Sequence, residues 1–433
     1  MNHFFNRYLD KVTAQIRSKE GQRLVKKELH SHLRQSKQAN MRSGLTEEES
    51  EQKAVLTMGD PVQLGKGMNK LYRPLVDWWM LFLVMGIFVL SFAPYFLVEI
   101  QAMRFEAQFI SVLLSMLFLF GFMYIDFRKI LFYWKWFIGA AFLYIWLFLV
   151  GITLHSSYIY HMHVLAKFQF FGVKIPHQWF IILIFIGLIG YMTHMKITTF
   201  KQMIPIFILM WLPVMVMADY LSPFLSLLLL FLVVVLVIFS PIVKKLKYQF
   251  LYMNSIFIGL TALWFMITME HRVARIVGWI NQTINNADSY IYILLQDMVQ
   301  ASSWFGQSEV IWSNYMDDMH TVTALALIIY YGGWVLAGLI LLVFVAILIR
   351  LAKMLMQMNH QQAKLLLAGG IVLLASPFLY NTLMIFGLMP YSAVNFPMIS
   401  YGGFERIYYA SVIGMMLSVY RQKLFLDQST VSS

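Results

Sequence analysis

Long apolar runs alternate with short polar connections from about residue 75 to the end of the chain. Each run is near the roughly 20 residues that an α-helix needs to cross the hydrocarbon core of a bilayer. The pattern predicts an all-α polytopic membrane protein with about ten transmembrane helices. These spans are expected at about residues 75–98, 108–125, 133–154, 178–194, 203–218, 223–243, 248–268, 321–349, 363–386 and 404–420.

The first part of the chain has a different pattern, with charged residues between apolar residues at helical spacing. Gly44 is expected to end one helix, and Thr46 with Glu49 forms the sequence signature of a capping box for the next. The dipeptide Asp60-Pro61 indicates a turn. The predicted domains are a small cytoplasmic helical domain at 1–74, a transmembrane domain at 75–425 and a cytoplasmic tail at 426–433.

Composition supports the membrane assignment. The chain is 60% hydrophobic and 12% charged, whereas a soluble domain is about 25% charged. It has no cysteine, which excludes disulfides and thiolate metal sites. No cleavable signal peptide is expected, because the first apolar run begins so far from the N-terminus.

The net charge of +12 could suggest a nucleic-acid partner, but its distribution does not. Most lysines and arginines between the spans fall on the connections that share a side with the N-terminus. By the positive-inside rule this side is cytoplasmic, and both termini are then inside. The basic residues are interpreted as topology signals in a lipid bilayer, and no nucleic-acid partner is expected.

A long segment between the seventh and eighth spans, residues 269–320, is expected to form a large extracellular loop. It holds six acidic residues, and its stretch SYIYILLQDMVQASSWFG is amphipathic and aromatic. Such a segment is expected to lie along the membrane surface. Structured loops of this length are usually functional.

The stretch FGLMPYSAVNFPMISYGG, residues 386–403, resembles the signature of the SEDS family, which includes FtsW, RodA and SpoVE. The matching residues are Gly387, Leu388, Pro390, Pro397, Ile399, Ser400, Tyr401, Gly402 and Gly403. Weaker matches follow in the family's order, with Asp219 in MADYLSPFL and His320 in MHTVTALAL. The segment 1–74 resembles the helical prefix of some permease-like proteins of Gram-positive bacteria.

The resemblance implies a ten-helix fold in the bacterial plasma membrane and a role in cell shape or division. It implies a peptidoglycan glycosyltransferase that polymerises lipid II, the undecaprenyl-linked disaccharide precursor. It also implies a class B penicillin-binding transpeptidase as a partner.

Such a reaction needs a base that takes a proton from the acceptor sugar hydroxyl. The family's aspartate falls on Asn285 or Asn286, depending on the direction of counting, and Asp288 is the nearest carboxylate. We therefore take Asp288 as the candidate catalytic residue. Its alternative role is that of a solvated loop residue or a helix N-cap.

The pyrophosphate leaving group needs cationic stabilisation. Arg272, Arg275 and Arg406 are candidates, with lipid anchoring or pairing to Glu405 as the alternatives. A divalent cation is compatible with this chemistry, but no metal ligands are assigned. In particular, His155, His161 and His163 lack a neighbouring carboxylate and are not taken as a zinc site.

The remaining candidate substrate contacts are Asp219, His320 and the residues of the hinge, namely Pro397, Ser400, Tyr401, Gly402 and Gly403. Pro397 is expected to prevent helix formation before it, and Gly402 and Gly403 to allow a positive φ or a close approach. Irregular backbone at membrane depth must line a cavity or be buried in protein. The hinge is expected to line an outward-facing cleft, with a tight packing turn as the alternative.

Several polar residues of the family pattern are missing. Its glutamate falls on Gln178 and its lysine on Ile181, its aspartate after His320-Thr321 falls on Val322, and its acidic pair falls on Tyr330-Tyr331. Two hypotheses follow. The protein is either an active polymerase with a rebuilt site, or a catalytically degenerate scaffold or regulator of a transpeptidase. A third hypothesis is a lipid or solute transporter, which the intact PMISYGG sequence disfavours.

Overall fold

The structure is a computed structural model that describes residues 3–72, 74–97, 103–154, 168–170, 173–175, 177–220, 222–268, 270–281, 290–306 and 321–424. The chain divides into two compact units. One contains Met1–Val76 and Tyr420–Ser433, and the other contains Asp77–Val419.

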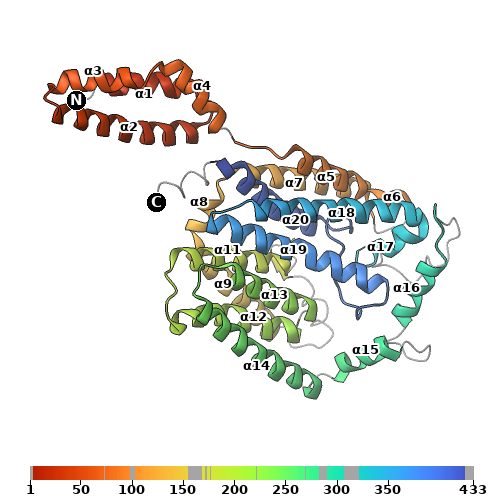
Figure 1. Ribbon diagram of the computed structural model, residues 1–433. Coiled ribbons are helices and arrows are strands. Elements are labelled where there is room, and N and C mark those ends of the chain that lie inside the picture. Colours follow the sequence, from red (N-terminus) through yellow and green to blue (C-terminus); the bar gives the residue numbers. More distant parts are fainter. Residues whose placement is uncertain are drawn as a thin grey trace. The chain divides into compact units, whose positions relative to one another are not determined.

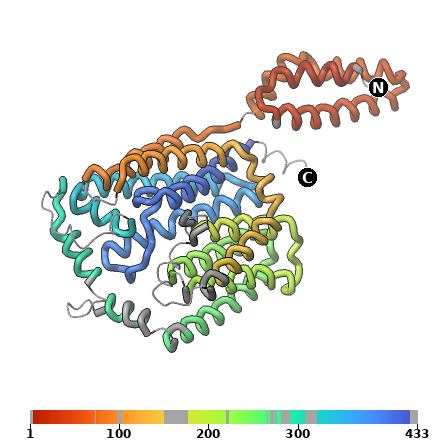
Figure 2. The backbone as a smooth tube through the Cα atoms, turned by 180° about the vertical axis from the view of Figure 1, so that it is seen from behind, coloured from red at the N-terminus to blue at the C-terminus, as the bar shows by residue number. Residues whose placement is uncertain are grey.

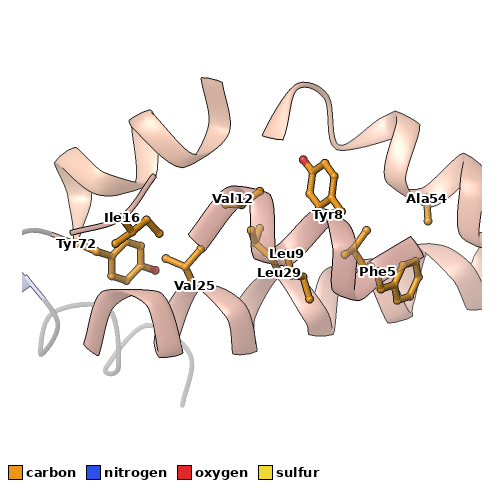
Figure 3. Close-up of a cluster of buried hydrophobic side chains, with 10 residues drawn as sticks. Phe5, Tyr8, Leu9, Val12, Ile16, Val25, Leu29, Ala54 and Tyr72 are labelled. Atoms are coloured by element: carbon orange, nitrogen blue, oxygen red, sulfur yellow. The ribbon is translucent and has the colours of Figure 1, made fainter. Parts of the chain in front are cut away.

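The first unit contains a small helical domain (Figure 1). Its helices are α1 (His3–Ala14), α2 (Lys19–Arg42), α3 (Glu47–Thr57) and α4 (Pro61–Leu71). Buried apolar residues of α1, α2 and α3 meet in one core together with Ile16 and Tyr72, and Leu64 and Met68 of α4 pack against it (Figure 3). The core residues are Phe5, Tyr8, Leu9, Val12, Ile16, Val25, Leu29, Leu33, Ala54 and Tyr72.

The predicted helix boundaries in this unit are confirmed. Helix α2 ends before Gly44, whose φ is 94°. Thr46 and Glu49 form the predicted capping box of α3. Asp60 caps α4 by accepting hydrogen bonds from the backbone N–H groups of Val62 and Gln63. These boundaries follow from local hydrogen bonds, which is why the sequence predicts them well.

The second unit is a bundle of long helices, with α15 (Glu270–Asn281) and α16 (Tyr290–Gln300) at one end (Figures 1 and 2). Its first half contains α5 (Trp78–Leu90), α6 (Ala93–Leu97), α7 (Phe105–Tyr124), α8 (Phe127–Phe132), α9 (Trp134–Leu154), α11 (Gln178–His194), η1 (Phe200–Met203) and α12 (Ile204–Tyr220). Its second half contains α13 (Pro223–Phe239), α14 (Lys244–Thr268), α17 (Ala324–Leu327), η2 (Ile328–Gly332), α18 (Gly333–Met356), α19 (Gln361–Ile385) and α20 (Gly403–Arg421).

Helices occupy all ten predicted spans, which confirms a polytopic helical membrane protein. Five helical segments of the described chain are long and apolar enough to cross a membrane, and others are apolar but shorter. Some ends differ from the prediction, since α14 begins at Lys244 and α18 continues to Met356. Lysine and arginine at a helix end can extend toward the interface, so charge does not mark the end of such a helix.

One short antiparallel hairpin interrupts the all-α architecture. It pairs β1 (Phe168–Phe170) with β2 (Val173–Ile175), with Phe168 opposite Ile175. The sequence analysis did not anticipate these strands, which are only three residues long.

Helix α20 lies in the interior of the bundle, because every residue from Arg406 to Val419 is buried. Its Gly414 approaches the backbone of Leu119 in α7, and its Met416 lies against Gly370 in α19. Helix α14 is the opposite case, since most of its apolar side chains are exposed. The start of α20 is therefore held by protein on several sides, and this fixes the segment before it.

Candidate functional site

The segment between α19 and α20, residues 386–402, contains no helix and carries the PMISYGG sequence. Two side chains of α19 hold its first half. Tyr380 donates its hydroxyl to Pro390 O at 2.9 Å, and Asn381 donates its amide to Val394 O at 2.5 Å. Asn381 also donates to Val322 O at 2.7 Å, so a single buried amide joins this segment to the start of the eighth span.

The turn at Pro397 is tight and buried in protein. The hydroxyl of Ser400 accepts the backbone N–H of Phe396 at 2.9 Å, and Met398 has a φ of 65°. Met398 and Ser400 are both buried. Pro397 thus stands in non-helical backbone as predicted, and the side-chain bond of Ser400 closes the turn.

The prediction about the two glycines is wrong. Neither Gly402 nor Gly403 has a positive φ, and the left-handed residue of the turn is Met398. A Cβ on Gly402 would meet no atom within 4 Å, and one on Gly403 would make only ordinary contact with Ser111. The left-handed residue Met398 lies four residues before Gly402, and the side-chain bond of Ser400, not a glycine, closes the turn.

The predicted phosphate contact of Arg406 is also not supported by its position. Its side chain is 1% exposed. Nε donates to Met398 O at 3.1 Å, Nη2 donates to Ser400 O at 3.2 Å, and Nη1 donates to the hydroxyl of Ser111 in α7. The guanidinium therefore faces the turn and supports its carbonyl groups, so that Arg406 positions the segment and does not face an open cleft.

Glu405 lies next to the turn and is only partly buried. Its Oε2 accepts a hydrogen bond from the amide of Asn395, and its Oε1 accepts one from Gln178 Nε2 at 3.4 Å. Gln178 begins α11, at the position where the resemblance implies a glutamate. The structure places the Glu405 carboxylate of α20 beside the Gln178 amide of α11.

The structure shows a contact for one of the other predicted site residues and only a helix position for three more, and the rest lie outside the described residues. The Tyr401 hydroxyl accepts the backbone N–H of Arg104 at 3.2 Å, which joins the hinge to the start of α7. Asp219 is at the end of α12, and Arg272 and Arg275 are in the first half of α15. Asp288 and His320 lie outside the described residues, as do His155, His161 and His163.

Two residues that the sequence analysis did not select connect the large loop to the hinge segment. Trp279 of α15 donates its indole N–H to Gly387 O at 2.8 Å. Tyr292 of α16 accepts the backbone N–H of Tyr391 at 2.8 Å. Both are aromatic residues with a polar group at one end, which is the only sequence signal that could have selected them. Polar residues inside spans, such as Ser111 and Asn381, carried a stronger signal.

A third connection joins the described end of the loop to α18. Ser303 O and Trp304 O accept the backbone N–H groups of Trp334 and Val335 at 3.1 and 3.2 Å. Gly333 has a φ of 80°, and a Cβ there would collide with the backbone of Trp304 and Gly306. The break in the eighth span at π-helical η2 therefore frees N–H groups that the loop satisfies.

An apolar crevice of about 300 Å³ lies between α12, α13, α14 and α15. Its lining is almost entirely apolar and includes Trp211 from α12, Leu230 from α13 and Ala262 from α14. Val273 and Ile276 of α15 also line it, and each directly follows one of the two arginines, Arg272 and Arg275, in the sequence. Such a crevice can hold a hydrocarbon chain, because it offers no polar partner to a more hydrated ligand.

Within the described part of the chain, no group of three or more His, Cys, Asp or Glu residues could hold a metal ion.

Comparison with solved structures identifies the fold over most of the chain. No family model and no curated protein matches the chain. Among solved structures, a chain of a peptidoglycan synthase complex that coordinates polymerization and crosslinking is similar at a TM-score of 0.63 and 17% identity, over 80% of this chain and 98% of that one. The Rod shape determining protein RodA of Thermus thermophilus is similar at a TM-score of 0.56 and 17% identity, over 80% of this chain and 97% of that one. An Asp-to-Ala mutant of the same RodA matches equally well, with 98% of its chain covered. The chain therefore has the fold of RodA.

Proposed function

We propose that this protein is a peptidoglycan glycosyltransferase that polymerises lipid II and acts in cell shape or division. The observation that carries the proposal is the fold, because nearly the whole of RodA superposes on this chain despite 17% identity. The PMISYGG segment lies in non-helical backbone between the last two spans, with residues 397–400 buried, and irregular backbone at membrane depth must be buried in protein or line a cavity.

Three features of the second unit suit a lipid-linked saccharide. The apolar crevice would take the polyprenyl chain, and Arg272 and Arg275 of the adjoining α15 would neutralise the pyrophosphate. The sugars would then lie near the hinge segment, to which α15 is joined through Trp279. Asp288 remains the proposed base, taking a proton from the acceptor hydroxyl as that oxygen attacks the anomeric carbon.

The proposed orientation follows from the charge pattern. Both termini would be cytoplasmic, and the end of the bundle that carries α15 and α16 would face outward. Segment 1–74 would then be a cytoplasmic domain, and a class B penicillin-binding transpeptidase would be the partner. The similarity to a chain of a peptidoglycan synthase complex supports such a partner.

The direct test supplies fluorescent lipid II to the purified protein, alone and with its co-purified partner. Glycan chains from the wild type and none from Asp288→Ala would support the proposal. Asp297→Asn is a matched control, because Asp297 is an acid of the same loop that lies on the described helix α16. Absence of product from the wild type in every condition would exclude polymerase activity.

The crevice gives a second test. Ala262→Trp places a large side chain in its lining, whereas Leu263→Trp adds the same side chain at an exposed position of the same helix. We expect only the first to slow polymerisation, by about tenfold or more, since it competes with the lipid chain for the space. Equal rates in the two variants would show that the crevice does not hold the substrate.

A catalytically degenerate scaffold is the second candidate. It is favoured by Gln178, Val322 and Tyr330, which stand at positions where the resembling sequences carry carboxylates. A scaffold would support the partner's transpeptidase reaction while making no glycan itself. The polymerisation assay with a partner present separates the two candidates.

A further inference from the structure

The carboxylate of Glu405 is unusual for its location. It lies in the first turn of a helix whose next fourteen residues are all buried, yet it is itself partly exposed. Two amides, those of Gln178 and Asn395, hold its two oxygens in a fixed orientation. An ionisable side chain within a transmembrane bundle costs free energy of folding and usually has a function.

Three buried polar groups on residues near Glu405, in the sequence or through the Gln178 contact, have no hydrogen-bond partner among the described residues. They are the Tyr408 hydroxyl, the Trp179 indole N–H and the Gln178 side-chain oxygen. Tyr408 is 1% exposed and lies one turn after Glu405 on the same helix. The rings of Trp179 and Tyr408 meet edge to face with centroids 6.1 Å apart, and Gln178 bonds to Glu405, so these four side chains are connected by direct contacts or by one helical turn.

A simple capping role does not account for this cluster. An acid in the first turn of a helix is favoured by the helix dipole, which explains a charge at Glu405. It does not explain three further polar atoms that are buried without a partner, since each of these is costly when unpaired. Their number and proximity indicate a ligand that both donates and accepts hydrogen bonds.

The chemistry of the cluster selects the class of ligand. Trp179 and Tyr408 are donors, and Glu405 and the Gln178 oxygen are acceptors. A metal ion would not use an indole N–H, and a phosphate would be repelled by the carboxylate. A sugar hydroxyl both donates and accepts, and aromatic rings beside amide and carboxylate groups suit a saccharide.

We propose that Glu405, Gln178, Trp179 and Tyr408 form a subsite for a sugar hydroxyl of the substrate, with Glu405 as its principal acceptor. This rests on the proposed function, because the saccharide would be that of the lipid-linked precursor. In this arrangement α20 supplies the carboxylate that α11 lacks at Gln178, across the hydrogen bond that joins them.

The experiment measures binding to the purified full-length protein, with lipid II and with undecaprenyl pyrophosphate as the two probes. Glu405→Gln is expected to weaken binding of lipid II about tenfold or more, and to leave binding of the sugar-free lipid unchanged. Tyr408→Phe removes a single buried hydroxyl and is expected to act in the same direction by a smaller factor. Glu106→Gln is the matched control, since Glu106 is an exposed acid in the first turn of α7.

A swap variant tests the geometry. Gln178→Glu combined with Glu405→Gln returns the carboxylate to the other end of the same hydrogen bond, and should recover most of the lost affinity for lipid II. Equal losses for both lipids, or no loss in both Glu405→Gln and Tyr408→Phe, would overturn the subsite. If the wild type binds lipid II no better than undecaprenyl pyrophosphate, the proposed function itself fails.

Discussion

Removal of the Arg406 side chain should loosen the hinge segment before it affects any other part of the bundle. The guanidinium is buried, and it bonds to Met398 O, Ser400 O and the Ser111 hydroxyl. Each buried acceptor left without its donor costs about 1–3 kcal/mol, and three acceptors lose one here, so we take a total cost of about 3–5 kcal/mol. Part of that cost arises because the carbonyl groups of the turn are left buried and unpaired.

At roughly 2 °C per kcal/mol for a large domain, Arg406→Met should lower the melting temperature by about 6–10 °C. Size-exclusion profiles of the detergent-purified protein after heating would measure this shift. Arg104→Met is the matched control, because Arg104 is an exposed arginine near the same end of the bundle. We expect the control to change the melting temperature by less than about 1 °C.

A double-mutant cycle then separates this bond from general damage to the core. Ser111→Ala alone should cost about 1 kcal/mol. Combined with Arg406→Met it should cost less than the sum, because the two variants remove the same bond. Strict additivity, or a melting temperature for Arg406→Met within 2 °C of the wild type, would refute the assignment of Arg406 as the support of the turn.

Three further predictions concern other parts of the chain. Gly333→Ala should lower the stability by about 2 kcal/mol or more, because the φ there is positive and the added Cβ would meet the backbone of the large loop. Gly402→Ala changes the PMISYGG sequence but should leave the melting temperature unchanged in the same heating assay, because an added Cβ would meet no atom there. Hydrogen bonds from the Thr46 hydroxyl and backbone N–H hold the pKa of the Glu49 carboxyl below its usual range. Protection of the start of α3 from hydrogen exchange should therefore be present above the ordinary glutamate pKa and be lost as the pH falls through the lowered value. Thr46→Ala deletes the hydroxyl and leaves the backbone N–H, so it should reduce this pH dependence, and an unchanged profile would contradict it. Trp279→Phe deletes the bond to Gly387 O, and should raise hydrogen exchange in the segment that follows α19 but not in α3.

The sequence by itself determined the features that depend on neighbouring residues. The length of each apolar run placed all ten spans, because a membrane helix satisfies its own backbone and needs only about 20 apolar residues. Thr46 marked a helix start and Asp60-Pro61 marked the turn before α4, through bonds that reach two or three residues along the chain. Pro397 marked the interruption before the last span for the same local reason.

Only the tertiary structure decided which polar residues pair with one another and what they do between and within these helices. Arg406 and Ser111 are 295 residues apart, and Gln178 and Glu405 are 227 apart, so no local pattern could pair them. The positive φ fell on Met398 and not on a glycine, because Arg406 and Ser400 hold the turn from outside the residue itself. Burial of α20 on all sides forced these contacts, since a charged or hydroxyl group enclosed by a bundle must find its partner on another helix.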